Sequence, residues 1–186
     1  MVAVREGHLA GEFDLDLWVT KFGLEKQQVK HFKALYKTMD TLALEQDNPA
    51  LIVKAREMAE ILQNMHMDLD TLKAALVYPW CELDLLDDEK IVELTSSKVV
   101  TLLNNVSEMA AIKTLHGQGR QLSTNQVDNL RRMLMAMVAD VRAVVIKLAE
   151  RVAYLREIKN EDEETRVLAA REITDIYAPL ANRLGI

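Results

Sequence analysis

Apolar residues recur at intervals of three and four along most of this chain, a spacing typical of amphipathic helices. The clearest example runs from about Glu25 to Leu44, where one apolar stripe is formed by Val29, Phe32, Leu35, Tyr36, Met39 and Leu42. No segment alternates between apolar and polar residues as a half-buried strand would. The pattern therefore predicts an all-α fold, organised as a single-domain helical array.

Polar residues and prolines indicate where further helices begin and end. Asn48 followed by Pro49 predicts a helix start, because asparagine caps free amides and a first-turn proline removes an amide that has no partner. Asp68 or Asp70 is expected to cap a short helix after it. Pro79 is expected to end that short helix, since an interior proline lacks the amide hydrogen that the helix needs.

The second half of the chain continues this pattern of helices. Further helix starts are predicted at Asp87 with Asp88, at the capping box Ser123-x-x-Gln126, at Asp140, and at the acidic run from Glu161 to Glu164. The helical region that begins at Asp87 and Asp88 should reach about Leu115, and residues 116–121, which include two glycines, should form a loop. Because no stretch is long enough to be a linker, we expect one domain over residues 1–186.

Length and composition narrow the class of protein. The 186 residues, 49% of them hydrophobic, are enough to bury one sizeable core. The formal net charge is −6 with basic and acidic residues mixed, which indicates no basic face for duplex nucleic acid. The longest apolar stretch, residues 133–146, contains two charges and falls short of the roughly 20 apolar residues of a membrane span. With one cysteine and no signal peptide, the chain is expected to be cytoplasmic and to have no membrane partner.

Individual residues suggest no recognisable active site. The histidines His8, His31, His66 and His116 lack the HExxH spacing of a metal site, and none lies beside the single cysteine. Cys81 has no neighbouring base, so a small semi-buried hydrophobic residue is the favoured interpretation. Acidic residues on adjacent turns favour solvated helix faces over a phosphate pocket for the basic residues Arg131, Arg132, Lys147, Arg151 and Arg156.

Two long strings in the second half carry a family resemblance. Residues 131–158 read RRMLMAMVADVRAVVIKLAERVAYLREI and residues 169–186 read AAREITDIYAPLANRLGI. Both resemble the hydrolase half of the RelA/SpoT homologue family. The resemblance implies an HD-type fold, in which a histidine, a His-Asp pair and a distant aspartate hold a divalent metal, usually manganese, that cleaves the 3′ pyrophosphate from the alarmone guanosine tetraphosphate. It is weakest over residues 1–48, which we expect to be divergent N-terminal helices, and stronger over residues 49–186.

The resemblance also indicates that the metal ligands are lost. Active relatives have a sequence like AALLHDVIEDT where this chain has AALVYPWCELD, so Tyr78 stands for the histidine and Pro79 for the aspartate. The upstream histidine falls at Lys54, and Glu150 stands for the distant aspartate. A divalent metal needs several imidazole and carboxylate donors, of which only Glu150 remains. We therefore expect no metal, no cofactor and no hydrolysis, and an altered backbone at Tyr78 before the proline.

Within that family, the missing ligands point to the monofunctional synthetase branch. In such relatives the last string is followed by a synthetase domain, which transfers pyrophosphate from ATP to the 3′ hydroxyl of GTP, and by regulatory domains that engage the ribosome. The resemblance thus implies an N-terminal pseudo-hydrolase domain that regulates the adjacent synthetase domain. Two alternatives stay open: a nucleotide-binding sensor using Lys147, Arg151 or Arg156, and a hydrolase whose altered metal site combines Glu150 with residues such as Glu82 or Asp84.

Overall fold

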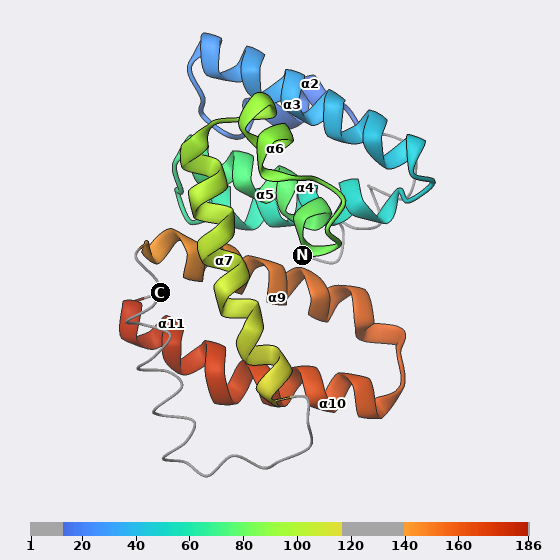
Figure 1. The fold of residues 1–186 in the computed structure, drawn as a ribbon, viewed down its shortest axis with the longest axis vertical. Coiled ribbons are helices and arrows are strands. Elements are labelled where there is room, and N and C mark those ends of the chain that lie inside the picture. The colour runs from blue at the N-terminus through green and yellow to red at the C-terminus, as the bar shows by residue number, and fades with distance from the viewer. Residues whose placement is uncertain (1–12, 117–139, 186) are drawn as a thin grey trace. The chain divides into compact units, whose positions relative to one another are not determined.

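The computed structural model describes residues 13–116 and 140–185, and the regular elements in these ranges are helices (Figure 1). The predicted all-α fold is confirmed for this part of the chain. The chain divides into two compact units, the first ending at Val100 and the second beginning at Thr101. We describe each unit by itself.

The first unit is built around a pair of packed helices. Its elements are α2 (Leu15–Thr20), α3 (Lys26–Glu45), α4 (Ala50–Asn64), α5 (Leu69–Glu82), α6 (Asp88–Leu94) and the beginning of α7 (Ser97–His116). Helix α4 packs along α5, and α3 contacts both of them. The predicted cap of α5 is confirmed, because Asp68 Oδ1 accepts a hydrogen bond from the Thr71 amide at 2.9 Å. The predicted start at Asn48 is one residue early, since Pro49 occupies the N-cap of α4.

An aromatic cluster forms one part of the core of this unit. Its members are Phe13, Trp18, Phe22, Phe32 and Tyr36. The ring centroids of Trp18 lie 4.6 Å from Phe22 and 5.9 Å from Phe32, within the range at which aromatic rings attract each other. Trp18 Nε1 also donates a hydrogen bond to Glu60 Oε1 at 2.7 Å. The cluster therefore links α2 and α3, and the Trp18 hydrogen bond adds α4.

Pro79 does not end its helix, so this prediction is wrong. Helix α5 continues through Pro79 to Glu82, and Tyr78 is helical too, which also corrects the expected change of backbone shape. The proline removes one helical hydrogen bond, but the next residue holds the turn in place. Trp80 is fully buried, and its Nε1 donates a hydrogen bond to Gln46 Oε1 at the end of α3, 2.9 Å away.

The helical region predicted from Asp87 to about Leu115 is confirmed, and it consists of two helices, α6 and α7, separated at Thr95 and Ser96. Thr95 leaves the helical conformation with φ −133° and ψ −92°. The Ile91 carbonyl accepts hydrogen bonds from both the Thr95 amide, at 2.9 Å, and the Thr95 hydroxyl, at 2.6 Å. The predicted loop after residue 116 and the predicted capping box at 123–126 lie outside the described residues.

The second unit contains the rest of the described helices. They are α9 (Val141–Glu157), the 3₁₀ turn η1 (Ile158–Asn160), α10 (Glu163–Glu172), the π-helical turn η2 (Ile173–Tyr177) and α11 (Ala178–Leu184). The predicted caps are confirmed: Asp140 accepts from the Arg142 amide at 2.9 Å, and Asp162, within the acidic run, accepts from the Thr165 amide at 2.8 Å. The π turn η2 separates α10 from α11, a feature that the sequence pattern did not indicate. None of the described helices is long and apolar enough to cross a lipid bilayer.

Candidate functional site

Three of the four predicted ligand positions lie on two packed helices of the first unit, Lys54 on α4 and Tyr78 and Pro79 on α5. The Lys54 ammonium nitrogen lies 2.5 Å from Glu82 Oε2 at the end of α5. The two side chains are 17% and 28% exposed, so this ion pair between helices is partly shielded from water. Lys54 therefore brings a positive charge to the former ligand position. Glu82, the alternative ligand considered above, already faces that charge.

The α5 turn itself offers few donors to a metal. Tyr78 is 4% exposed, and a phenol ionises only far above neutral pH. Pro79 is buried, and its side chain has no donor atom. Burial, and then the negative charge of Asp88, raise the pKa of the Cys81 thiol to about 12. A thiol with this pKa stays protonated near neutral pH and is a poor nucleophile.

The fourth position, Glu150, lies within a network of charged side chains in the second unit. Its side chain is 0% exposed on α9. Glu150 Oε2 accepts a hydrogen bond from Arg151 Nε at 2.6 Å and lies 2.9 Å from Lys147 Nζ, while Oε1 accepts from Arg151 Nη2 at 2.5 Å. Arg151 Nη1 also donates to Glu172 Oε2 on α10 at 3.3 Å. These four residues, two cations and two carboxylates, form the buried charge network.

The carboxylates of the buried charge network favour the charged form of Arg151. Burial alone would lower the pKa of Arg151, but the hydrogen bonds and charge of Glu150, and then the charge of Glu172, outweigh it and raise that pKa. Burial, and then the charge of Glu172, raise the pKa of Tyr177, so its phenol stays neutral. The Arg151 guanidinium carbon also lies 4.6 Å from the centroid of the Tyr154 ring, a favourable cation–π distance.

These residues do not fit a divalent metal ion. In the first unit a lysine stands at a ligand position, and in the second both oxygens of Glu150 already face cationic donors. A metal at Glu150 would have to displace Lys147 and Arg151, whose positive charges repel it. Across residues 13–116 and 140–185, no three His, Cys, Asp or Glu side chains are grouped closely enough to hold a metal ion. His31 and His66 are exposed.

The suggested nucleotide contacts differ in burial. Lys147 and Arg151 are 1% and 2% exposed, and their charged groups point at the carboxylates of the buried charge network. Arg156 is half-buried near the end of α9. Nucleotide binding by these residues stays a prediction, and the geometry does not favour it for the first two.

Glu172 is the member of the network that sequence reasoning missed. It lies three residues after Ala169 and four before Ile176, both of which are buried. A carboxylate at such a position in an apolar stripe is rarely buried without a cation. This spacing was a signal that could have predicted a basic partner for Glu172.

The sequence that forms these helices matches a known family model. Residues 33–186 fit the family model described as HD domain. The match covers far more than half of the chain, which therefore belongs to the HD-domain family.

Within this family the chain is similar to GTP pyrophosphokinases. It is 47% identical over 194 residues to the GTP pyrophosphokinase of Escherichia coli K12 and 44% identical over 190 residues to that of Photobacterium angustum, with 100% of this chain and 26% of each relative covered. A guanosine-3′,5′-bis(diphosphate) 3′-pyrophosphohydrolase of Vibrio cholerae is 36% identical over 135 residues, which is 73% of this chain and 18% of that protein. The resemblance to the RelA/SpoT family is confirmed. The chain spans about a quarter of the length of the GTP pyrophosphokinases and corresponds to their N-terminal region.

Proposed function

We propose that this chain is the N-terminal pseudo-hydrolase domain of a RelA-type GTP pyrophosphokinase. The parent enzyme would transfer pyrophosphate from ATP to the 3′ hydroxyl of GTP in the stringent response, in the cytoplasm. The domain would not hydrolyse the alarmone but would regulate the adjacent synthetase domain, while downstream domains engage the ribosome. The observation that carries this proposal is the buried charge network, which engages Glu150 with two cations of the same helix.

Loss of hydrolysis follows from the chemistry that a metal would supply. A divalent cation lowers the pKa of a bound water toward neutrality and offsets the charge of the pyrophosphate. Lys54 pairs with Glu82, and Glu150 pairs with Lys147 and Arg151. The carboxylates at both positions are therefore already bound to side-chain cations and are not available to a metal ion. Without the metal, no remaining group at these positions activates water.

A regulatory role is supported by the elements that the network joins. Arg151 on α9 is bonded to Glu172, the last residue of α10, and the next residue begins the π turn that leads to α11. Turns of π-helix are frequent at functional sites. A change at the network would therefore act directly on the segment that, in the relatives, precedes the other three quarters of the protein.

Hydrolysis is tested on the purified chain with guanosine tetraphosphate and manganese. We expect no release of pyrophosphate above the rate in buffer and no metal retained after dialysis. The Glu150→Gln variant is the matched control, because it removes the one remaining carboxylate of the former ligand set. Turnover by the wild-type chain that disappears in this variant would show a working metal site and contradict the proposal.

Regulation is tested separately in the full-length parent with Glu172→Gln, which breaks the network at its α10 end. We expect the rate of alarmone synthesis to change by about fivefold or more, as for other coupled sites. Lys90→Gln, on the surface of α6, is the control and should leave the rate unchanged. Equal rates in wild type and Glu172→Gln, with both proteins folded, would refute regulation through this network without restoring hydrolysis.

A further inference from the structure

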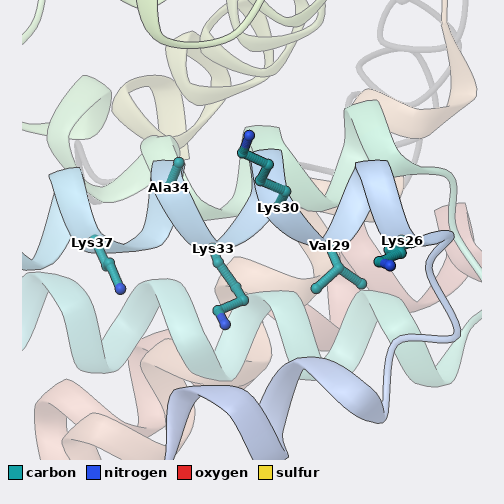
Figure 2. Close-up of a pocket in the computed structure, with 6 residues that line it drawn as sticks. All are labelled: Lys26, Val29, Lys30, Lys33, Ala34 and Lys37. Carbon is teal, nitrogen blue, oxygen red and sulfur yellow. The ribbon is translucent and has the colours of Figure 1, made fainter.

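A row of lysines follows one side of α3 in the first unit. Lys26, Lys30, Lys33 and Lys37 recur at intervals of four, three and four residues, which places them on one face of the helix. We call these four residues the lysine row. Together with two small apolar residues they line a hollow of about 380 Å³, formed by Lys26, Val29, Lys30, Lys33, Ala34 and Lys37 (Figure 2). Figure 2 shows the lysines on successive turns, with the end of Lys30 turned toward one edge of this face and the ends of Lys33 and Lys37 toward the other edge.

The positive charge of the lysine row is only partly neutralised. Lys33 forms an ion pair with Asp16 on α2, and the charge of Lys37 also acts on Asp16 at longer range; Asp16 is 76% exposed. Within the described residues, no carboxylate lies at ion-pair distance from Lys26, Lys30 or Lys37, and all three are exposed. The lining residues of the hollow include no carboxylate either. The row is therefore a local basic surface on a chain whose formal net charge is −6.

This arrangement is unfavourable for the free helix. Like charges three or four residues apart destabilise a helix, and the row contains three such neighbouring pairs in succession. Elsewhere the chain places acidic residues near its basic ones, as in the Lys90–Glu93 pair of α6. A ligand with regularly repeated negative charges would relieve this repulsion.

The geometry of the row narrows the chemistry of that ligand. A bilayer surface is disfavoured, because the apolar residues in the hollow are only Val29 and Ala34, and neither inserts deeply into lipid. A compact phosphate pocket is disfavoured as well, since the row extends for about 16 Å along the helix axis. A duplex holds its phosphates on two fixed paths, which a row one lysine wide does not follow. A flexible single strand can adjust its phosphates to the row.

We propose that the lysine row of α3 is a binding surface for the phosphodiester backbone of single-stranded nucleic acid. No aromatic side chain lines the hollow to stack on bases, so binding depends on the backbone and not on base identity. This function is independent of the pseudo-hydrolase role proposed above. It is also compatible with the absence of a duplex-binding face expected from the net charge.

The test measures fluorescence anisotropy of labelled oligouridine of about 20 nucleotides with the purified chain at low salt. We expect saturable binding. A plot of the logarithm of the binding constant against the logarithm of the salt concentration should have a slope of about −2, because each of the three lysines without an ion pair contributes about −0.7. A DNA strand of the matching sequence tests whether the row distinguishes RNA from DNA, and binding of either strand supports the proposal. Tighter binding of an RNA hairpin than of the single strand would contradict the proposed preference for single-stranded nucleic acid.

Two triple variants separate the row from charge in general. The first variant combines Lys26→Gln, Lys30→Gln and Lys37→Gln. It should weaken binding about tenfold or more and make the binding constant less dependent on salt. It should also raise Tm by about 1–3 °C, because like-charge repulsion in α3 is removed. The second variant is the control and combines Lys73→Gln, Lys90→Gln and Lys98→Gln. It removes the same charge from other helices and should leave binding nearly unchanged.

Three results would overturn the proposal. The first is the absence of any anisotropy change with either strand at low salt. The second is an equal loss of binding in the two triple variants, which would indicate general electrostatic attraction. The third is binding of polyglutamate without binding of RNA or DNA, which would make an acidic polypeptide the occupant of the row.

Discussion

Glu150 is a buried carboxylate that is stabilised only by its neighbours. Both of its oxygens receive donors from Arg151, and Lys147 adds a second positive charge. Removing two opposite charges together from a protein interior costs little compared with removing one of them, which leaves its partner buried and uncompensated. The buried charge network is therefore sensitive to any change that alters a single member.

We predict that Glu150→Gln destabilises the chain by about 3 kcal/mol, because it leaves two buried cations with the single charge of Glu172. The expected fall in Tm is roughly 6–12 °C for a protein of this length. Thermal unfolding followed by circular dichroism measures the change.

The control for this prediction is Lys90→Gln, which breaks the exposed Lys90–Glu93 pair with side chains 44% and 68% exposed. Solvent screening makes such a pair worth less than about 1 kcal/mol. Equal losses of stability in the two variants would mean that the interior network contributes no more than a surface ion pair.

The sequence indicates which residues to consider at the site but not which side chains they contact. The family resemblance predicts Lys54, Tyr78, Pro79 and Glu150 as the former ligand positions. It does not reveal that Lys54 contacts Glu82 or that Arg151 contacts Glu172, because these partners lie 28 and 21 residues away on other helices. Side-chain partners across helices depend on packing, which a local pattern does not contain.

Helix α5 shows how packing overrides a local signal at the scale of an element. Pro79 lacks an amide hydrogen, so the carbonyl four residues earlier loses its helical partner. The helix nevertheless continues because Trp80 is anchored in the core by its hydrogen bond to Gln46. The proline thus remains in the helix at an energetic cost.

Replacing the proline should recover part of this cost. We predict that Pro79→Ala stabilises the chain by about 1–2 kcal/mol. Alanine gains helix propensity, and this gain is reduced by two losses: the packing of the buried proline ring, and the restriction that proline places on the unfolded chain. Urea unfolding is a suitable measurement. Lys73→Ala on the same helix is the control and should change stability by less than about 0.5 kcal/mol. A loss of stability in Pro79→Ala would mean that the packing of the ring outweighs the missing hydrogen bond.

Capping residues were better guides to the elements than the proline was. Asp68, Asp140 and Asp162 each accept a hydrogen bond from an amide of the first turn, as local sequence predicts, because a cap acts within three residues of itself. The break at Thr95 and the π turn at Ile173–Tyr177 were not predicted. Both breaks nevertheless have local causes: Ser96 Oγ accepts a hydrogen bond from the Val99 amide at 3.4 Å, and Pro179 at the start of α11 removes a helical hydrogen bond to the π turn.

At the scale of the whole molecule, a single HD-domain model spans residues 33–186, and the structure divides the same chain after Val100. The predicted former ligand positions are divided between the two units, with Lys54, Tyr78 and Pro79 in one and Glu150 in the other. A bound metal would add stability to the folded chain. Lys54 instead pairs with Glu82, and Glu150 pairs with Lys147 and Arg151, each within its own unit. The stability of this chain should therefore not depend on a metal.

This independence is measurable as a thermal shift. A ligand at 100 times its Kd adds about 2.7 kcal/mol to the free energy of unfolding, which raises the Tm of a protein of this length by roughly 5–10 °C. We predict that manganese at about 1 mM changes Tm by less than about 1 °C, because a divalent cation would have to displace Lys147 and Arg151 from Glu150. Calcium at the same concentration controls for non-specific binding to the acidic surface. A rise of several degrees with manganese but not calcium, absent in Glu150→Gln, would mean that the charges of the two units rearrange around a metal after all.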